Sequence, residues 1–222
     1  MKILKLRLFQ ETACYKKPFA FKIEETYPLP PYSTVIGMLH KILGAKSGEY
    51  YPMNISIQGD YESLNLNYIR KIKFATEKKK REYKRKYNID MDATTAPFYT
   101  QFLFNVNLII HVKAEDDIID KIYNNIISGK ESFTLGRNED LVRIDGISYV
   151  QESDITNVIT NHNAYVFEDD AEHGIHFRLN YNYKLKDDLR VFDKVNVRYV
   201  EKETQILKCK KDNENDLIFF IK

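Results

Sequence analysis

Two apolar stripes at helical spacing, each flanked by segments of alternating polarity, constrain the fold of this chain more than any other feature. The first stripe comprises Val35, Ile36, Leu39, Ile42 and Leu43. The second comprises Ile118, Ile119, Ile122, Ile126 and Ile127. A period of 3.6 residues places apolar side chains on one side of a helix, whereas alternation places them on one face of a strand. The sequence therefore predicts strand, helix, strand, a long insertion, strand, helix and strand.

The expected strands cover residues 2–9, 54–60, 98–112 and 141–144. Together with the two helices they give the order βαββαβ, which is the split βαβ arrangement of ferredoxin-like and RRM-like domains. The sequence therefore predicts the α+β class, with both helices on one face of an antiparallel sheet.

The first helix has recognisable boundaries. Three prolines between residues 28 and 31 exclude an earlier start, and Ser33 or Thr34 is expected to cap the helix. Gly44 is expected to end it. Gly37, inside the helix, costs roughly 1 kcal/mol relative to alanine. Close packing against the sheet is therefore expected at Gly37.

The chain changes character after about residue 152, where no helical stripe appears. Short alternating segments, separated by polar turns, predict strands at residues 163–168, 175–183, 191–200, 203–209 and 216–221. We therefore expect two domains. Residues 1–152 form the ferredoxin-like domain with its insertion, and residues 153–222 form a small β-rich C-terminal domain.

Composition limits the cellular setting. The net charge is only +2, so global charge does not identify a partner. Cys14 and Cys209 lie far apart in the sequence, which favours a reducing compartment over a disulfide framework. No apolar run approaches the ~20 residues that span a bilayer, and the N-terminus lacks a signal-peptide core. We expect a cytoplasmic protein without membrane contact.

A basic cluster at residues 70–86 is the strongest charge feature. Its cations are Arg70, Lys71, Lys73, Lys78, Lys79, Lys80, Arg81, Lys84, Arg85 and Lys86, interleaved with Tyr68, Phe74, Tyr83 and Tyr87. Phosphates are attracted to such a cluster, and unpaired bases stack on aromatic rings. A charge run alone is more often a solvated loop. A long insertion in a compact domain is usually either functional or disordered, so the position of the cluster between two strands strengthens the case for RNA binding.

A second candidate contact lies at residues 134–138, between the second helix and the last strand of the βαββαβ unit. Gly136 permits a close approach of the backbone, and Arg137 can hold a phosphate with two parallel hydrogen bonds. The pattern by itself favours an ordinary helix-to-strand loop with a surface arginine.

The residues alone predict no metal, cofactor or catalytic group. His173 and His176 lie near three acidic residues at 169–172, but their spacing matches no metal signature, and a polar turn explains them better. RNA-recognition domains share the βαββαβ order, yet Ile3, Phe9 and the strand at 102–110 do not reproduce their aromatic motifs. Stacking of bases on the sheet face is therefore not expected.

Three stretches together resemble the CRISPR-associated Cas-five family of the repeat-associated mysterious protein superfamily, in a form closest to type I-B. Residues 27–44 resemble the family's first-helix signature of proline, small hydroxyl residues and glycine. Residues 133–144 resemble its glycine loop, and the opening strand followed by Tyr15 resembles the segment before the first helix. The order of elements agrees over about residues 1–150.

The resemblance implies a subunit of a type I CRISPR effector (Cascade) that binds the 5′ handle of CRISPR RNA and caps the backbone filament in antiviral defence. Its partners would be the CRISPR RNA, the repeated backbone subunit, the large subunit and, within the complex, target DNA. A protruding thumb would occupy about residues 66–100. The implied RNA contacts are Tyr15, Lys16, Lys17, Tyr32, Arg70, Lys71, Lys73, Lys78, Lys79, Lys80, Arg81, Lys84, Arg85, Gly136 and Arg137.

One branch of the family cleaves precursor RNA without a metal, and resemblance to that branch implies a Tyr, a Lys and a His at one site. The candidates here are Tyr32, His40, Lys41 and His111. Such cleavage requires a base and a cationic group near the phosphate. Nothing in the sequence brings the candidates together. A non-catalytic RNA-binding subunit is therefore the first hypothesis, the endoribonuclease the second, and an adaptor that contacts only proteins the third.

Overall fold

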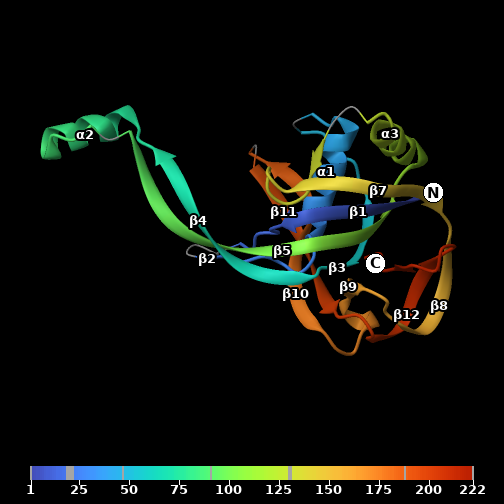
Figure 1. Cartoon of the computed structure of the whole chain (residues 1–222). Helices are drawn as coiled ribbons and strands as arrows, with labels where there is room; N and C mark the ends of the chain where they lie inside the picture. The colour runs from blue at the N-terminus through green and yellow to red at the C-terminus, as the bar shows by residue number, and fades with distance from the viewer. Residues whose placement is uncertain are drawn as a thin grey trace.

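The computed structural model describes residues 2–18, 23–46, 48–90, 92–129, 132–187 and 189–221. Six elements form the predicted βαββαβ unit, and Figure 1 shows them around the centre of the molecule. They are β1 (Ile3–Ala13), α1 (Tyr32–Leu43), β3 (Asn54–Asp60), β5 (Ala93–Lys113), α3 (Asp116–Ile127) and β7 (Leu141–Val150). The strands lie in the order β3-β5-β1-β7, and all three neighbouring pairs are antiparallel. The α+β class and the ferredoxin-like order are therefore confirmed.

Alternation along the strands builds the core on one face of the sheet. Leu6 of β1 lies opposite Ile110 of β5 on one side and Ile147 of β7 on the other. The predicted stripes of α1 and α3 pack on this face, in one cluster with the apolar side chains of the strands. Ile127 is the exception, because it is 60% exposed and its place in the predicted stripe is therefore wrong. This burial of apolar surface is the main stabilising term for the unit.

The boundaries of α1 differ in part from the prediction. The helix begins at Tyr32 after Pro31, and no side chain caps it, so the expected caps at Ser33 and Thr34 are wrong. Gly44 adopts a left-handed conformation with φ of 69° and ends the helix as predicted. The expected packing at Gly37 is also wrong, because a Cβ added there meets no heavy atom within 4 Å.

The remaining strands extend the sheet and add a second one. The strands β9 (Asn163–Phe167), β11 (Leu189–Val200) and β10 (Ile175–Lys186) continue the main sheet beyond β3. A second sheet contains β8 (Glu152–Ile159), β12 (Gln205–Asp212) and β13 (Leu217–Ile218), and a short 3-10 helix, η1, spans Glu168–Asp170. The expected boundary near residue 152 falls between β7 and β8, and β8 is a strand that the sequence pattern did not predict.

The second sheet covers the face of the main sheet opposite the helices. Ser56 Oγ accepts a hydrogen bond from the Phe219 amide at 2.9 Å, and Gln58 Nε2 donates to the Leu217 carbonyl at 2.7 Å. These two side chains alternate along β3 with Ile55 and Ile57, which face the helices. The C-terminal segment is therefore held on the main sheet by polar side chains of its second face.

A long two-stranded arm leaves the main sheet, as Figure 1 shows at the upper left. It contains β4 (Ser63–Phe74), the helix α2 (Glu77–Tyr87) at its tip, and the first half of β5. The register pairs Ser63 with Phe104 and Phe74 with Ala93. We call residues 63–104 the thumb, and the thumb expected at about residues 66–100 falls within it. Two short strands, β2 (Ile23–Glu24) and β6 (Phe133–Thr134), pair with β5 and β7.

The helix α2 was not predicted, because it lacks the apolar stripe used to recognise helices. Its sequence, EKKKREYKRKY, consists mainly of residues with high helix propensity. Asn88 follows in a left-handed conformation with φ of 52° and ends the helix. None of its residues is buried. Among the described helices, none is both long and apolar enough to cross a membrane.

Candidate nucleic-acid interface

The register of the thumb gives its two strands two different faces. The even-numbered residues of β4 lie on one face of the thumb, together with Tyr99 of β5. The apolar ones among them are Leu66, Tyr68, Ile72 and Phe74. All five side chains are exposed, and Phe74 reaches 80%. Soluble proteins rarely leave such a contiguous apolar stripe uncovered unless it binds a partner. We call this face the apolar face.

The opposite face of the thumb carries cations and two phenylalanine rings. Lys71 and Lys73 lie on this face with Phe98 and Phe102 of β5. Lys71 Nζ lies 4.1 Å from the centre of the Phe98 ring, and the guanidinium carbon of Arg137 lies 4.5 Å from that of Phe102. We call this face the basic face. Arg70, unlike Lys71 and Lys73, lies on the apolar face.

Most of the predicted cations remain unpaired. Lys71, Lys80 and Lys84 form ion pairs with Glu24, Asp92 and Asp90, respectively. The others form no ion pair within the residues that the structure describes: Arg70, Lys73, Lys78, Lys79, Arg81, Arg85 and Lys86. On α2, Lys78, Arg81 and Arg85 share one side of the helix, since their spacing is i, i+3 and i+7. The tip therefore presents a row of cations to solvent.

Glu24 joins three segments at the base of the thumb. Its carboxylate accepts hydrogen bonds from Lys16 Nζ at 2.7 Å, Lys71 Nζ at 2.5 Å and Thr100 Oγ1 at 3.0 Å. Burial alone would raise the pKa of Glu24, but these three hydrogen bonds outweigh it and lower the pKa to about 2. The sequence did not single out Glu24. Two predicted RNA contacts, Lys16 and Lys71, are thus brought together by a buried carboxylate that neutralises part of their charge.

Lys17 lies beside the base of the thumb but pairs with a different carboxylate. Its Nζ lies 3.2 Å from Glu25 Oε2 and 6.0 Å from the centre of the Tyr27 ring. The predicted Lys16 and Lys17 contacts therefore lie at the surface, each shared with one neighbouring carboxylate.

The glycine loop is organised by Asp140, which the sequence analysis also missed. Asp140 Oδ2 accepts hydrogen bonds from the Cys14 amide at 3.0 Å and the Arg137 amide at 2.9 Å. Asp140 Oδ1 accepts from Arg137 Nη2 at 2.6 Å. Asp140 is 1% exposed, so these hydrogen bonds replace the water that would otherwise solvate its carboxylate. The sequence signal for this role was the position of an acidic residue, Asp140, three residues after Arg137.

Gly136 and Arg137 consequently have structural roles. Gly136 has φ of +110°, and an added Cβ would lie 2.8 Å from Asp140 Oδ2. Arg137 stacks on Phe102 and pairs with both Asp140 and Glu139. The Arg137 guanidinium, which was predicted to contact RNA, is therefore largely occupied by partners within the protein. Its contact with Phe102 connects the glycine loop to the thumb.

Two predicted RNA contacts belong to the core instead. Tyr15 is 1% exposed, and its hydroxyl donates to Gln10 Oε1 at 2.6 Å. Tyr32 is fully buried and packs against Tyr165 and Tyr181. Neither ring has surface that a base or phosphate could touch in this conformation. We therefore correct both assignments.

The four nuclease candidates do not form one site. His40 Nε2 accepts a hydrogen bond from the Tyr51 amide at 2.9 Å, so its Nδ1 donates to the Ile36 carbonyl at 2.7 Å. Burial lowers the pKa of His40, in keeping with a neutral ring. Tyr32 precedes His40 by eight residues on α1, about 12 Å along the axis, and Lys41 is exposed. His111 lies on β5 and is fully buried.

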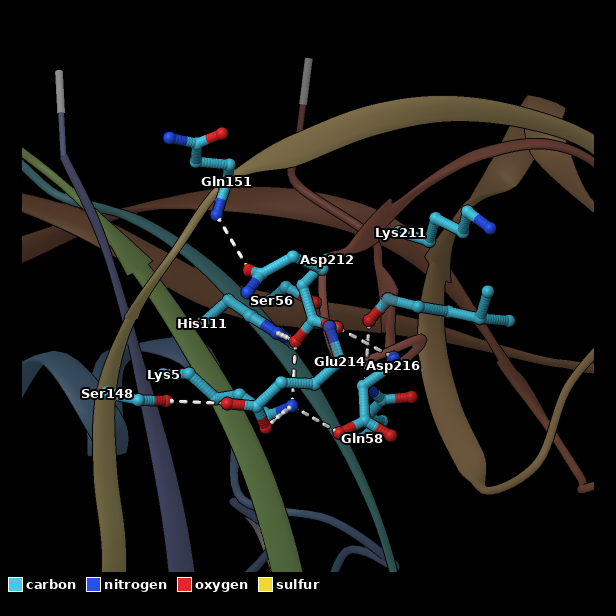
Figure 2. A network of polar contacts seen from close by, with 12 residues as sticks. Lys5, Ser56, Gln58, His111, Ser148, Gln151, Lys211, Asp212, Glu214 and Asp216 are labelled. Carbon is cyan, nitrogen blue, oxygen red and sulfur yellow. Dashed lines mark hydrogen bonds and ion pairs between the residues drawn. The ribbon is translucent and has the colours of Figure 1, made fainter.

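His111 belongs to a buried polar network on the face of the main sheet opposite the helices, drawn in Figure 2. Its Nε2 lies 3.1 Å from Asp212 Oδ2, and Lys5 Nζ lies 2.7 Å from the same oxygen. Lys5 also pairs with Glu214 at 2.8 Å and with Asp216. The three carboxylates at 212–216 have the spacing of metal ligands. The ammonium of Lys5 already supplies a cation to them, so the network joins β1 to the C-terminal sheet.

Comparisons with known proteins agree with this architecture. The sequence profile described as CRISPR-associated protein (Cas_Cas5) matches residues 3–204. No curated protein matches the sequence. A chain of a "CRISPR RNA-guided surveillance complex" superposes with a TM-score of 0.63 at 16% identity, covering 92% of this chain and 91% of that chain.

Two further solved structures are less similar in shape. A "Cas protein" has a TM-score of 0.49 at 14% identity, over 92% of this chain and 94% of that chain. A CRISPR protein from Archaeoglobus fulgidus has a TM-score of 0.49 at 9% identity over all of both chains. The fold is therefore supported by the surveillance-complex chain, and the family by the profile. Because that profile spans most of the sequence, the chain belongs to the CRISPR-associated protein (Cas_Cas5) family.

Proposed function

We propose that this chain is an RNA-binding subunit of a type I CRISPR effector, Cascade, that holds the 5′ handle of CRISPR RNA and caps the backbone filament in antiviral defence. The observation that carries the proposal is the thumb, which presents unpaired cations beside exposed aromatic rings. Single-stranded RNA is bound by such surfaces, because cations contact phosphates while bases stack on the rings. Membership of the family supports the same function.

The tip helix α2 supplies the electrostatic part of the interaction. Lys78, Arg81 and Arg85 lie along one side of the helix without a carboxylate partner in the described chain. Each phosphate contact on single-stranded RNA lowers the slope of log affinity against log salt by about 0.7. Three contacts from this row would therefore make binding strongly salt-dependent. Tyr83 and Tyr87, whose rings lie 5.4 Å apart on another side of α2, offer stacking surface.

The two faces of the thumb suit two kinds of partner. We assign RNA to the basic face and the repeated backbone subunit to the apolar face, because Ile72 and Phe74 are 60% and 80% exposed. Large exposed apolar side chains are most effectively stabilised by a protein surface that excludes water. The large subunit, and target DNA within the assembled complex, complete the expected set of partners.

We propose that the chain does not cleave RNA itself. A general base has to reach the 2′-hydroxyl within hydrogen-bond distance. Both ring nitrogens of His40 are engaged, and the Tyr32 hydroxyl is buried. Precursor processing is therefore assigned to a separate enzyme.

The test mixes the purified full chain with labelled repeat RNA in EDTA and records both mobility shift and cleavage products. We expect a salt-sensitive shift without products. The triple variant Lys78→Ala, Arg81→Ala and Arg85→Ala should reduce the salt slope by about 2. A charge-matched control replaces Lys46, Lys121 and Lys202, which are exposed and lie outside the thumb.

The other outcomes are distinct. Discrete products in EDTA would establish the endoribonuclease function instead. Absence of any shift would favour the adaptor that contacts only proteins. Equal loss of binding in the thumb variant and in the control would show that RNA is attracted by general charge, and the thumb assignment would then be rejected.

A further inference from the structure

A polar hollow of about 400 Å³ lies beside the base of the thumb. Its walls come from the segment at residues 16–18, the start of α1, and the hairpin formed by β10 and β11. These elements are far apart in the sequence, and the hairpin belongs to the region after residue 152. The hollow is therefore a product of the tertiary structure and was not predicted.

Four cations surround this hollow, and no acidic residue of the described chain lines it. They are Lys16, Lys17, Arg178 and Lys194. The hairpin register explains why Arg178 and Lys194 meet there. Lys194 lies directly opposite Asn180, and Arg178 lies two residues from Asn180 on the same face of β10. Leu179, which lies between Arg178 and Asn180 in the sequence, points into the core. Alternation along β10 thus directs Arg178 and Asn180 into the hollow.

The two hairpin cations have no partner of their own. Neither Arg178 nor Lys194 forms an ion pair or side-chain hydrogen bond with any described residue. Lys16 and Lys17 each share one carboxylate, Glu24 or Glu25, outside the hollow. Four like charges around one space repel one another. An anion placed in the hollow would relieve that repulsion and stabilise the arrangement.

The other lining groups define which anion fits. Asn180 contributes an amide, and Ser33 and Thr34 contribute hydroxyls, so the walls hold hydrogen-bond donors as well as charge. The oxygens of a phosphate accept all of these bonds, and the guanidinium fork of Arg178 matches a phosphate edge. The hollow also lies next to the base of the thumb, because Lys16, which lines the hollow, shares Glu24 with Lys71 of β4.

We infer that this hollow binds one backbone phosphate of the RNA at the point where the strand leaves the base of the thumb. The inference rests on the proposed function, since it assumes that RNA lies on the basic face. It assigns to the β10–β11 hairpin a direct RNA contact through Arg178 and Lys194. The bound strand would then be held at two separated places, the thumb and the hollow.

The test compares the double variant Arg178→Ala and Lys194→Ala with the control Lys184→Ala and Lys186→Ala, in the full chain. The control residues are exposed on the far end of the same hairpin and do not line the hollow. We expect at least about tenfold weaker binding of repeat RNA for the first variant. Its salt slope should fall by about 0.7, as for one lost phosphate contact. The control should bind as the wild type does.

A second readout identifies the phosphate. Ethylation of single phosphates in the RNA should reveal one position that interferes with binding to the wild type but not to the Arg178/Lys194 variant. Retention of full affinity and of every interference position in that variant would overturn the inference. An equal loss in the control would do the same. Failure of the wild type to bind RNA would instead reject the proposed function. Loss of RNA binding in the thumb variant alone would keep the proposed function and reject the hollow as a phosphate site.

Discussion

Lys5 Nζ, on β1, lies 2.7 Å from Oδ2 of Asp212, the last residue of β12, and both side chains are almost completely buried. Burial alone would lower the pKa of Lys5, but the hydrogen bonds from its ammonium to three carboxylates outweigh burial and raise it. The pair therefore remains charged inside the protein and fixes the second sheet to the ferredoxin-like unit.

The first prediction concerns this pair. Lys5→Met should lower the free energy of unfolding by about 3–5 kcal/mol, because it leaves the buried Asp212 carboxylate without its cation. Urea unfolding at neutral pH measures the loss. Lys2→Met is the matched control, since Lys2 pairs with Asp120 at 2.7 Å in a largely exposed position. Its loss should be much smaller, because water and salt screen an ion pair at the surface, and equal losses would disprove the assigned role of burial.

The second prediction concerns Glu24, whose pKa falls to about 2. A carboxyl group with a lowered folded pKa stabilises the protein above its unfolded pKa of about 4.3, and this stabilisation disappears as the pH falls towards 2. The contribution of the Glu24 carboxylate to the free energy of unfolding is on the order of 3 kcal/mol at neutral pH. Glu24→Gln should therefore lower stability at pH 7 but change it little near pH 2. Urea unfolding across this pH range provides the measurement, with Glu25→Gln, at an exposed pair, as the control.

The third prediction concerns two glycines with opposite surroundings. Gly136→Ala should cost about 1–3 kcal/mol, because φ of +110° is unfavourable for a side chain and the new Cβ approaches Asp140. Gly37→Ala should instead stabilise the protein by about 0.5–1 kcal/mol, since the position is helical and open. Thermal and urea unfolding of both variants test the pair. Destabilisation by Gly37→Ala would contradict the open surroundings assigned to this position.

The fourth prediction concerns two tyrosine hydroxyls in the same aromatic cluster. Tyr32→Phe should raise stability slightly, because the buried Tyr32 hydroxyl has no hydrogen-bond partner among the described residues. Tyr165→Phe should lower it by about 1 kcal/mol, since its hydroxyl donates to the Leu29 carbonyl at 2.8 Å. If Tyr32→Phe were destabilised as much as Tyr165→Phe, an unseen partner such as a buried water would be indicated.

The fifth prediction concerns the apolar face of the thumb. The double variant Ile72→Ser and Phe74→Ser should keep the stability of the isolated chain within about 0.5 kcal/mol, because both side chains are exposed. Its recovery with the backbone subunit from a reconstituted effector should nevertheless fall. Ile89→Ser, which changes an equally exposed residue outside the two strands, should assemble normally. Normal assembly of the double variant would exclude the apolar face as a protein contact.

Local periodicity was sufficient to predict the ferredoxin-like unit. The stripes of α1 and α3 and the alternation of β1 and β5 are repeated over many residues, so each element could be recognised from its own sequence. The helix α2 escaped recognition because no face of it is buried, and β8 because its alternation is weak. Propensity alone, without an apolar stripe, was the remaining signal for α2.

The fold class and the concentration of cations in the thumb follow from the amino-acid sequence alone, because both depend on residues that are neighbours in the chain. The availability of each charge for a partner depends on how the chain folds. Glu24 and Asp140 engage Lys71 and Arg137, which lie on other segments or across a tight loop, and Arg178 joins Lys16 only through folding. Ion pairing and burial depend on distances between residues remote in sequence, and those distances are set only when the elements pack.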